Sequence, residues 1–462
     1  MSLAAHPTMG TGRLRRVLVA NRGEIALRVL RACRELDLET VIVHSEADAD
    51  SLPVRLADRA VCIGPARSNQ SYLNAEFIVS AAQIHHADAI HPGYGFLSEN
   101  ADFARLCEME KIVFVGPRAE VISQMGDKVR ARQLAAEAGV PVTPGSAGKL
   151  RDAAEAAQLA AQIGYPVLLK AAAGGGGRGM RVVREAGELA GQYADAAREA
   201  KVAFGDDAIY VEKFLSNIRH IEIQVLSDGA TVLHLGERDC SVQRRNQKLV
   251  EETPSPVLDA AVRARMCEAA VKLCRHVGYT SAGTIEFILD PGSSEFHFME
   301  MNTRIQVEHP VTEMVSGIDL VKAQLEIAGG KPLAIAQRDI RFDGHAIECR
   351  INAEDSARGF APCPGEISHY HAPGGPGIRV DSHMFSGYRI PPYYDSLLAK
   401  VVAWGRDRGE AIARMHRALN EMEIRGVTTT IPFHLGLLRH EAFLAGDVHT
   451  RFVEEQLLGV TA

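Results

Sequence analysis

A chain of 462 residues is too long for one small core, and its length predicts about two to four domains. Hydrophobic residues make up 46% of it and charged residues 24%, which is typical of a soluble globular protein. The net charge of −7, from 51 basic and 58 acidic residues, argues against bulk attraction to nucleic acid or to an anionic membrane.

The cysteines and the apolar runs indicate the compartment. The eight cysteines include no Cys-x-x-Cys pair and lie in apolar runs, so we expect buried, reduced thiols in a cytoplasmic protein. No apolar run is long enough to span a bilayer, and residues 1–12 lack the apolar segment of a secretory signal. Membrane and nucleic-acid partners are therefore not expected.

Short apolar strands alternate with helices in the first part of the chain. This alternation favours a parallel, doubly wound sheet. No Gly-x-Gly-x-x-Gly follows the first strand, which argues against a nicotinamide enzyme. The loop from His91 to Glu99 leaves a strand end where such sheets bind ligands, although a tight turn before the next helix is the alternative. The predicted strands are 16–21, 41–44, 61–64, 87–91 and 112–116, with helices such as 24–36 and 75–86 between them.

Four consecutive glycines, Gly174 to Gly177, separate two predicted strands at 167–170 and 181–184. A strand rather than a helix follows them and no Gly-Lys-Ser/Thr is present, so this is not a Walker A loop. Glycines let backbone N–H groups approach phosphate oxygens, and Lys170 adds a positive charge beside them. The pattern predicts a phosphate-binding hairpin, with a mobile linker as the alternative.

The strand 208–215 ends where adenine can be read by main-chain groups and touched by apolar side chains, at Glu212, Lys213, Phe214 and Leu215. The next strand, 220–225, alternates strictly, so its polar residues share one face that is either solvent-exposed or part of a site. The donor-rich stretch from Gly236 to Lys248 is, taken alone, typical of a solvated loop.

Acids and amides gather on the predicted strand that runs into Asn302. Alternation places Glu300 and Asn302 on one face, and Glu286 lies on the preceding strand. Three hard oxygen ligands of this kind suit Mg²⁺ or Mn²⁺, the usual companions of ATP phosphates. A surface hairpin with scattered charges is the alternative.

Arg304 and Gln306 follow directly, where a fork of donors can hold a small anion. Glu308 is then a candidate general base beside that anion. After residue 345 an alternating strand, a Pro/Gly-rich loop and an amphipathic helix at 407–424 predict a mixed α+β domain that ends the chain.

Collected in order, these pieces resemble the biotin carboxylase family, within the ATP-grasp superfamily, from Val17 to Phe452. The motifs are specific as a set, although any one of them alone is weak. They are His91-Pro-Gly-Tyr-Gly-Phe-Leu-Ser-Glu-Asn, Gly126-Asp-Lys, Lys170-Ala-Ala-Ala-Gly-Gly-Gly-Gly-Arg-Gly-Met, Glu237-Arg-Asp-Cys-Ser-Val-Gln-Arg-Arg, Glu300-Met-Asn-Thr-Arg-Ile-Gln-Val-Glu-His and Glu348-Cys-Arg-Ile-Asn-Ala-Glu.

The resemblance implies an α/β (α+β ATP-grasp) fold with three domains. These are an N-terminal domain at 13–126 with the parallel sheet, an ATP-grasp domain at 127–332 with a glycine-rich lid at about 142–215, and a C-terminal domain at 345–455. It also implies the reaction: ATP phosphorylates bicarbonate to carboxyphosphate, which yields CO₂ and phosphate, and N1′ of biotin is carboxylated.

The resemblance also implies residue roles, all in the numbering of this chain. ATP contacts are Lys128, Lys170, Gly176, Gly177, Glu212, Lys213, Phe214, Leu215, His220, Asn246, Lys248, Glu286 and Glu300. Two Mg²⁺ or Mn²⁺ sites use Glu286, Glu300 and Asn302. Bicarbonate meets Lys248, Arg304, Gln306, Val307 and Glu308, and biotin meets Tyr94 and Arg350. The catalytic residues are Arg304, Glu308 as base, Lys248, and Arg350, which stabilises the biotin enolate.

A structural ion pair of Arg350 with Glu348 or Glu354 is the alternative for that arginine. One position departs from the family pattern, because Asn246 stands where the family has histidine, and asparagine cannot carry a proton charge.

We expect a homodimer that works with a biotin carboxyl carrier protein and carboxyltransferase subunits. The Met-Lys-Met of a biotin-carrying domain does not occur in this chain, so biotin is expected as a carried substrate on another chain. The favoured holoenzyme is an acetyl-CoA carboxylase. The alternatives are a pyruvate or propionyl-CoA carboxylase, or a carboxylase-like regulatory protein without turnover.

Overall fold

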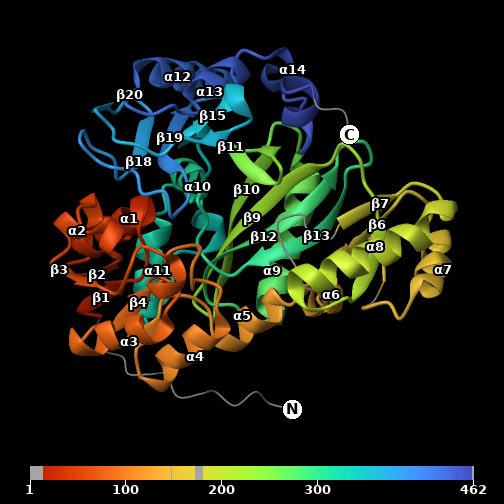
Figure 1. Cartoon of the computed structure of the whole chain (residues 1–462), viewed down its shortest axis with the longest axis horizontal. Helices are drawn as coiled ribbons and strands as arrows, with labels where there is room; N and C mark the ends of the chain where they lie inside the picture. Colours follow the sequence, from red (N-terminus) through yellow and green to blue (C-terminus); the bar gives the residue numbers. More distant parts are fainter. Residues whose placement is uncertain (1–13, 147, 172–179, 460–462) are drawn as a thin grey trace.

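The computed structural model describes residues 14–146, 148–171 and 180–459. Its three regions meet around a long central sheet (Figure 1). The predicted lid glycines Gly176 and Gly177 lie outside the described residues. The predicted α/β architecture, with a parallel N-terminal sheet, is confirmed.

The N-terminal region is built on a five-stranded sheet in the order β3-β2-β1-β4-β5, with every neighbouring pair parallel. Apolar side chains cover both faces of this sheet, as expected of parallel strands packed between helices. The predicted doubly wound sheet is therefore confirmed. Its elements are β1 (Arg16–Val19), α1 (Gly23–Glu35), β2 (Glu39–His44), α2 (Leu52–Leu56), β3 (Arg59–Cys62), α3 (Ala75–Ile84), β4 (Ala89–His91), α4 (Ala101–Met109) and β5 (Val113–Phe114).

The expected burial of the thiols holds for six of the eight free cysteines; Cys62 is exposed on the edge strand β3, and Cys363 is half-buried. In the part of the chain that the structure describes, no helix combines the length and apolar character that crossing a membrane requires.

The central sheet has eight strands in the order β13-β12-β9-β10-β11-β14-β19-β18. The stretch from Gly236 to Lys248 was expected to be a solvated loop, but it lies in β10 and β11 and is largely buried, so that interpretation is wrong. The strands are β9 (Arg219–Ser227), β10 (Val232–Arg244), β11 (Gln247–Thr253), β12 (Ser281–Asp290), β13 (Glu295–Asn302), β14 (His345–Asn352), β18 (Ile378–Ser382) and β19 (Leu397–Gly405).

Helices cover this sheet along its length. Near strands β9 to β13 lie α5 (Ala119–Gly126), α6 (Lys128–Glu137), α9 (Ala260–His276), α10 (His309–Ser316) and α11 (Leu320–Ala328). On the C-terminal strands lie α12 (Arg408–Glu421), α13 (Ile431–Leu437) and α14 (Glu441–Leu444). Because β11 pairs with β14, one sheet runs from the expected ATP-grasp domain into the expected C-terminal domain.

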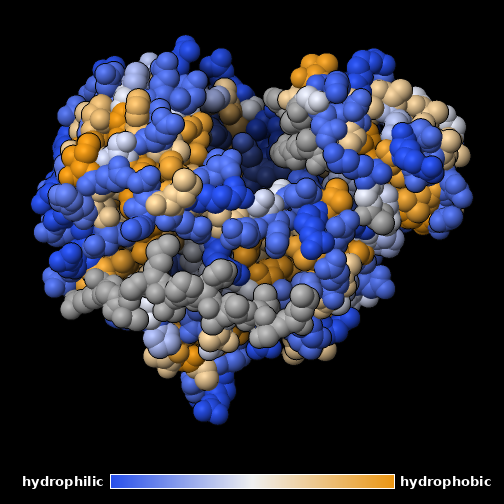
Figure 2. Space-filling model, turned by 90° about the horizontal axis from the view of Figure 1, so that it is seen from below, coloured by the Kyte–Doolittle hydropathy of each residue, from blue (hydrophilic) through white to orange (hydrophobic). Residues whose placement is uncertain are grey.

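The lid is a separate layer. Its strands β6 (Val167–Ala171), β7 (Met180–Val183) and β8 (Ile209–Lys213) form an antiparallel sheet in the order β7-β6-β8. With α7 (Ala153–Ile163) and α8 (Ala186–Phe204) it forms a small core of its own. The antiparallel pairing of β6 with β7 confirms the predicted hairpin flanks. Figure 2 shows a notch with a hydrophilic floor between the lid and the larger lobe.

A bulge in β13 decides which side chains face the site. Glu286 pairs with Glu300, but the next residue, Phe287, pairs with Phe298, so Met299 is the extra residue. The bulge turns Glu300 to the face opposite Phe298, which packs in the core. Unbroken alternation from Phe298 would instead have put both on one face.

Candidate active site

A cavity of about 750 Å³ lies where the three regions meet. Most of the side chains predicted from the sequence line it. They are Tyr94, Lys128, Lys170, Glu212, His220, Asn246, Lys248, Glu286, Glu300, Asn302, Arg304, Gln306, Val307, Glu308 and Arg350. Lys213, Phe214 and Leu215 are not among the described residues that line it.

Four charged residues form a row across neighbouring strands of the central sheet. Arg238 on β10 pairs with Glu222 on β9, which pairs with Glu286 on β12, and Glu286 pairs with Glu300 on β13. Side chains opposite one another share a face, so three carboxylates stand side by side and repel one another. The site therefore needs cations, and the neighbouring side chains supply them.

Lys248 is the central cation. Its Nζ lies 2.5 Å from Glu222, 3.0 Å from Glu286 and 2.7 Å from Glu308. Burial alone would lower the pKa of this ammonium, but the surrounding negative groups outweigh burial and raise its pKa well above the ordinary range. Lys248 therefore stays charged and joins the row of acids to the expected base.

Glu308 lies buried between two cations. Lys248 donates to Oε1 over 2.7 Å and Arg350 donates to Oε2 over 2.9 Å. Burial would raise the pKa of Glu308, but the charges of Lys248, Arg350 and Arg238 hold it well below the usual range. Glu308 is thus ionised at neutral pH. It becomes a stronger base when either cation turns toward a substrate anion.

Arg350 is held by Glu251 as well as by Glu308. Its Nε donates to Oε1 of Glu251 over 2.7 Å. The alternative ion pair with Glu348 or Glu354 is wrong, because neither carboxylate contacts Arg350 among the hydrogen bonds and ion pairs of the described residues. Burial raises the pKa of Glu251 to about 7, against the opposing effect of the Arg350 charge.

The predicted anion site is preorganised on the segment after β13. Arg304 donates to Glu99 and to Asn302, each over 2.9 Å, so the loop that begins at His91 closes onto the site. Gln306 donates to Glu286 over 2.8 Å and accepts from Arg238 over 2.7 Å. These contacts fix the directions of the guanidinium and the amide. The carbonyl of the next residue, Val307, accepts from Lys400 over 2.8 Å.

The acids that were predicted to bind metal fit a divalent cation. Glu286 and Glu300 face each other across β12 and β13. Burial is the main cause that raises the pKa of Glu300, and the charge of Glu286 raises it further. Among the described residues no hydrogen bond or ion pair takes up the Glu300 carboxylate, so a hard cation between the two acids would relieve their repulsion. Asn302 adds an amide beside them and donates to Glu286 over 2.8 Å.

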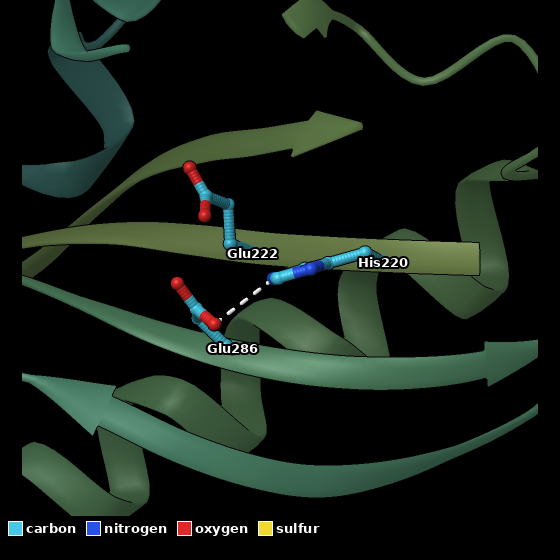
Figure 3. A group of neighbouring side chains, drawn as sticks. All are labelled: His220, Glu222 and Glu286. Carbon is cyan, nitrogen blue, oxygen red and sulfur yellow. Dashed lines mark ion pairs between the residues drawn. The ribbon is translucent and has the colours of Figure 1, made fainter. Parts of the chain in front are cut away.

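A second group of possible ligands lies one strand away. Figure 3 shows His220 and Glu222 on β9 beside Glu286, with Nε2 of His220 3.0 Å from a Glu286 oxygen. Both oxygens of Glu222 are already bonded, one to Arg238 and the other to Lys248, each over 2.5 Å. A metal ion at Glu222 would have to displace two buried cations. Glu286 also bonds Lys248, but its neighbour Glu300 has no hydrogen bond or ion pair among the described residues, so the pair Glu286 and Glu300 is the better metal site.

The nucleotide end of the cavity is framed by α6 and the lid. Asp127 caps α6 by accepting from the backbone N–H groups of Val129 and Arg130 over 2.9 and 3.0 Å, which fixes Lys128 at the helix start. Lys170 on β6 reaches Glu212 on β8 over 2.5 Å.

Lys213 points elsewhere and donates to the carbonyls of Gly164 and Tyr165 over 2.8 and 3.2 Å. Phe214 and Leu215 are half-buried beyond the end of β8. The expected apolar contact of these two side chains with adenine therefore stays a prediction.

Two further predicted residues, Tyr94 and Asn246, line the cavity. Tyr94 donates to the buried Glu24 and also lines a smaller adjoining cavity of about 240 Å³. Asn246 lies in the two-residue turn between β10 and β11, where Arg245 and Asn246 have φ of 47° and 63°. Two positive φ values in a two-residue hairpin favour asparagine, so the turn supplies a structural reason for the departure from histidine.

Sequence reasoning missed four residues of this site: Arg132, Glu222 as a ligand of cations, Arg238 and Glu251. Arg238 is fully buried and bonds Glu222, Gln224, Thr284, Gln306 and Thr312. Signals existed for two of them: Arg132 follows Lys128 by one helical turn, and Glu222 lies on the polar face of the alternating strand predicted at 220–225.

Family models match three consecutive parts of the chain. They are "Biotin carboxylase, N-terminal domain" at 13–122, "Carbamoyl-phosphate synthase L chain, ATP binding domain" at 127–336 and "Biotin carboxylase C-terminal domain" at 348–455. Biotin carboxylase 1 of Bacillus subtilis is 57% identical over 442 residues, which cover 96% of this chain and 98% of that protein.

A pyruvate carboxylase subunit of Methanothermobacter thermautotrophicus is 52% identical, over 97% of this chain and 91% of that protein. Among solved structures, a biotin carboxylase–β-γ-ATP complex from Campylobacter jejuni matches with a TM-score of 0.92 and 50% identity, over 96% of this chain and 99% of that one. The biotin carboxylase domain dimer of Hydrogenobacter thermophilus 2-oxoglutarate carboxylase, solved with MgADP, ADP and bicarbonate, matches with a TM-score of 0.91 and 51% identity, over 97% and 99%.

Proposed function

This chain belongs to the biotin carboxylase family, and on that premise we propose that it carboxylates carrier-bound biotin as the first half-reaction of an acetyl-CoA carboxylase. The enzyme class is an ATP-dependent ligase. The observation that carries the proposed mechanism is the position of Glu308 between Lys248 and Arg350. In this position the proposed base, Glu308, contacts both the proposed anion-binding cation, Lys248, and the proposed enolate-stabilising cation, Arg350.

The proposed first step uses the anion site. Bicarbonate binds to Lys248, Arg304 and Gln306, and Lys248 turns from Glu308 toward it. Glu308 then removes the bicarbonate proton, and a bicarbonate oxygen attacks the γ-phosphate of ATP to give carboxyphosphate and ADP. The developing phosphoryl charge is held by Lys128, Lys170 and His220, which line the same cavity.

The proposed metal ligands are Glu286, Glu300 and Asn302, and a divalent ion bound there supplies charge neutralisation for the phosphate oxygens. MgADP is named in the Hydrogenobacter structure, which supports Mg²⁺ for this chain. Burial would raise the pKa of Glu286, but the charges of Lys248 and His220 lower it, so this proposed metal ligand stays ionised.

The proposed second step uses Arg350. Carboxyphosphate breaks down to CO₂ and phosphate, and N1′ of biotin loses its proton and attacks CO₂. The negative charge that develops on the ureido oxygen of biotin is stabilised by the Arg350 guanidinium, with Tyr94 beside the ring. The N1′ proton passes to the basic phosphate released from carboxyphosphate, and the proton that Glu308 took from bicarbonate is released to solvent, which restores the base.

Bicarbonate-dependent ATP hydrolysis, measured with and without biotin, tests this activity. Hydrolysis that depends on both bicarbonate and biotin is expected. Binding of ADP without any turnover would instead favour the carboxylase-like regulatory protein.

Purified partner subunits then test the acceptor: transfer of labelled carboxylate to acetyl-CoA is expected, while transfer to pyruvate, propionyl-CoA or 2-oxoglutarate would overturn the acetyl-CoA assignment. Pyruvate is the second candidate because of the Methanothermobacter relative.

We also propose that the enzyme is a cytoplasmic homodimer that receives biotin on a carrier protein. The Hydrogenobacter domain is described as a dimer, which supports this assembly. A tethered biotin has a high local concentration, so free biotin should be the poorer substrate. Light scattering tests the dimer. An avidin blot and a carboxylation assay with biotinylated carrier test whether biotin arrives on another chain. A biotin-positive band on this chain would contradict the carrier model.

A further inference from the structure

Three charged side chains meet at the nucleotide end of the cavity, where α6 faces the lid. Arg132 on α6 donates from Nη1 to Oε1 of Glu212 over 2.7 Å, and Lys170 on β6 donates to Oε2 of the same carboxylate over 2.5 Å. The Glu212 side chain is only 9% exposed, against 15% for Arg132 and 19% for Lys170. One buried carboxylate thus has one cation on each oxygen.

The positions of Arg132 and Glu212 are fixed by the backbone around them. The other guanidinium nitrogen of Arg132 donates to the carbonyl of Thr143. Gly145 lies against β8 so closely that a Cβ there would stand 2.5 Å from the Val211 carbonyl and 3.1 Å from Glu212. Arg132 is therefore anchored by two acceptors, whereas Lys170 has Glu212 alone among the hydrogen bonds of the described residues.

Lys170 cannot serve Glu212 and a phosphate equally well. In the proposed function Lys170 binds the nucleotide phosphates, so its ammonium must turn away from Glu212 when a nucleotide enters. A buried carboxylate that loses its only cation is strongly destabilised, whereas one that keeps a firmly anchored guanidinium is not. Arg132 remains in place to compensate the charge.

We infer that Arg132 is a positioning residue for nucleotide binding, which neutralises Glu212 so that Lys170 is released to the phosphates. This inference rests on the proposed function, since it takes Lys170 as a phosphate ligand. It assigns a role to the Glu212 side chain that is separate from main-chain recognition of adenine. The ligands concerned are nucleoside di- and triphosphates, because only a phosphate tail draws Lys170 away.

A double-mutant cycle on the full chain tests the inference, with ADP as the probe and calorimetry as the readout. Arg132→Met should weaken ADP binding by about 10-fold or more, because Glu212 then retains Lys170. In the Glu212→Gln background the buried charge is gone, so adding Arg132→Met should change the ADP Kd by less than about 3-fold. The charge-conserving variant Arg132→Lys should keep most of the wild-type affinity for ADP.

Arg130→Met is the matched control, because Arg130 lies on the same helix but is exposed and pairs with Glu137 over 3.4 Å. It should leave the ADP Kd unchanged. In turnover, Arg132→Met should raise KM for ATP and change kcat little. An equal loss of ADP affinity in both Glu212 backgrounds, or no loss in either, would overturn the inference. Wild-type chain that binds no ADP would instead overturn the proposed function.

Discussion

Oε2 of Glu308 lies 2.9 Å from Nη2 of Arg350, so the proposed base and the proposed enolate-stabilising cation are bonded to each other. Each therefore sets the charge state of the other. Removing the acid leaves Arg350 with Glu251, and removing the guanidinium leaves two buried carboxylates with fewer cations. Substitutions at these two positions should have different kinetic signatures.

Glu308→Gln should lower turnover by about 10²-fold or more, because an amide cannot accept the bicarbonate proton. ADP binding should be largely unchanged, since the nucleotide residues Lys128 and Lys170 lie elsewhere in the cavity. The measurement is bicarbonate-dependent ATP hydrolysis beside ADP calorimetry. Near-normal turnover in this variant would remove Glu308 from the role of base.

Arg350→Ala should lower kcat for biotin carboxylation while KM for ATP changes little, because the guanidinium acts on charge that develops in the transition state. The structural alternative now concerns Glu251 rather than Glu348 or Glu354. Melting curves decide between them: a large loss of stability with unchanged specific activity would make Arg350 a purely structural partner of Glu251. Glu251→Gln, which keeps an acceptor for Arg350, is the companion variant.

Glu251 should make stability depend on pH. Its pKa is raised from the ordinary 4.5 to about 7 by burial, so between these values the folded chain binds more protons than the unfolded chain. The contribution of Glu251 to the free energy of unfolding is therefore complete below pH 4.5 and is lost as the pH rises through about 7. As the pH rises through this range, the melting temperature of the wild type should fall relative to that of Glu251→Gln. Two melting curves that stay parallel from about pH 5 to about pH 8 would contradict the prediction.

Glu300→Gln should weaken the dependence of nucleotide binding on Mg²⁺. The substitution removes one of the two facing acids, so a divalent cation loses a ligand and one negative charge. The measurement is the rise in melting temperature with ADP, with and without Mg²⁺. Glu295→Gln, an exposed position at the other end of β13, is the control and should leave the Mg²⁺ effect intact. An unchanged Mg²⁺ effect in Glu300→Gln would place the metal elsewhere.

Asn246→His should leave activity equal or raise it, because the family carries histidine at this position. The positive φ of 63° at Asn246 suits asparagine better, so a small loss of stability, about 1 kcal/mol or less, should accompany the change. Steady-state kinetics and thermal melting measure the two effects. A sharp fall in activity would mean that the pocket is built around asparagine.

Periodicity predicted the elements well where each one carries its own signal. The parallel strands of the first region and the helix α1, predicted at 24–36 and found at Gly23–Glu35, follow directly from apolar spacing. The shared face of Glu300 and Asn302 was also predicted, but the bulge at Met299 was not, because it depends on the register with β12. Without that register, alternation cannot show that Phe298 and Glu300 lie on opposite faces of the sheet.

The stretch around Arg238 shows that hydrophobic periodicity cannot predict the burial of charged residues whose partners lie on other strands. Its charges looked solvent-exposed because their partners, such as Glu222 and Gln306, come from distant parts of the chain. Glu222 itself stood on a face that was either exposed or part of a site, and only the neighbouring strands decide between these. Long-range charge compensation of this kind is a property of the sheet order.

The pairing of β11 with β14 has a mechanical consequence. Glu251 and Glu348 lie opposite each other in that pairing, and Arg350 is two residues further along β14. Arg350 on β14 and the proposed metal ligands on β12 and β13 therefore belong to one continuous sheet, whereas Lys170 and Glu212 lie on the separate sheet β7-β6-β8. A cut in the connection between α11 and β14 should leave two fragments that stay bound to each other through this seam. For the same reason, a biotin-site half produced alone would expose β14 as a bare edge, prone to pair with whatever strand it meets.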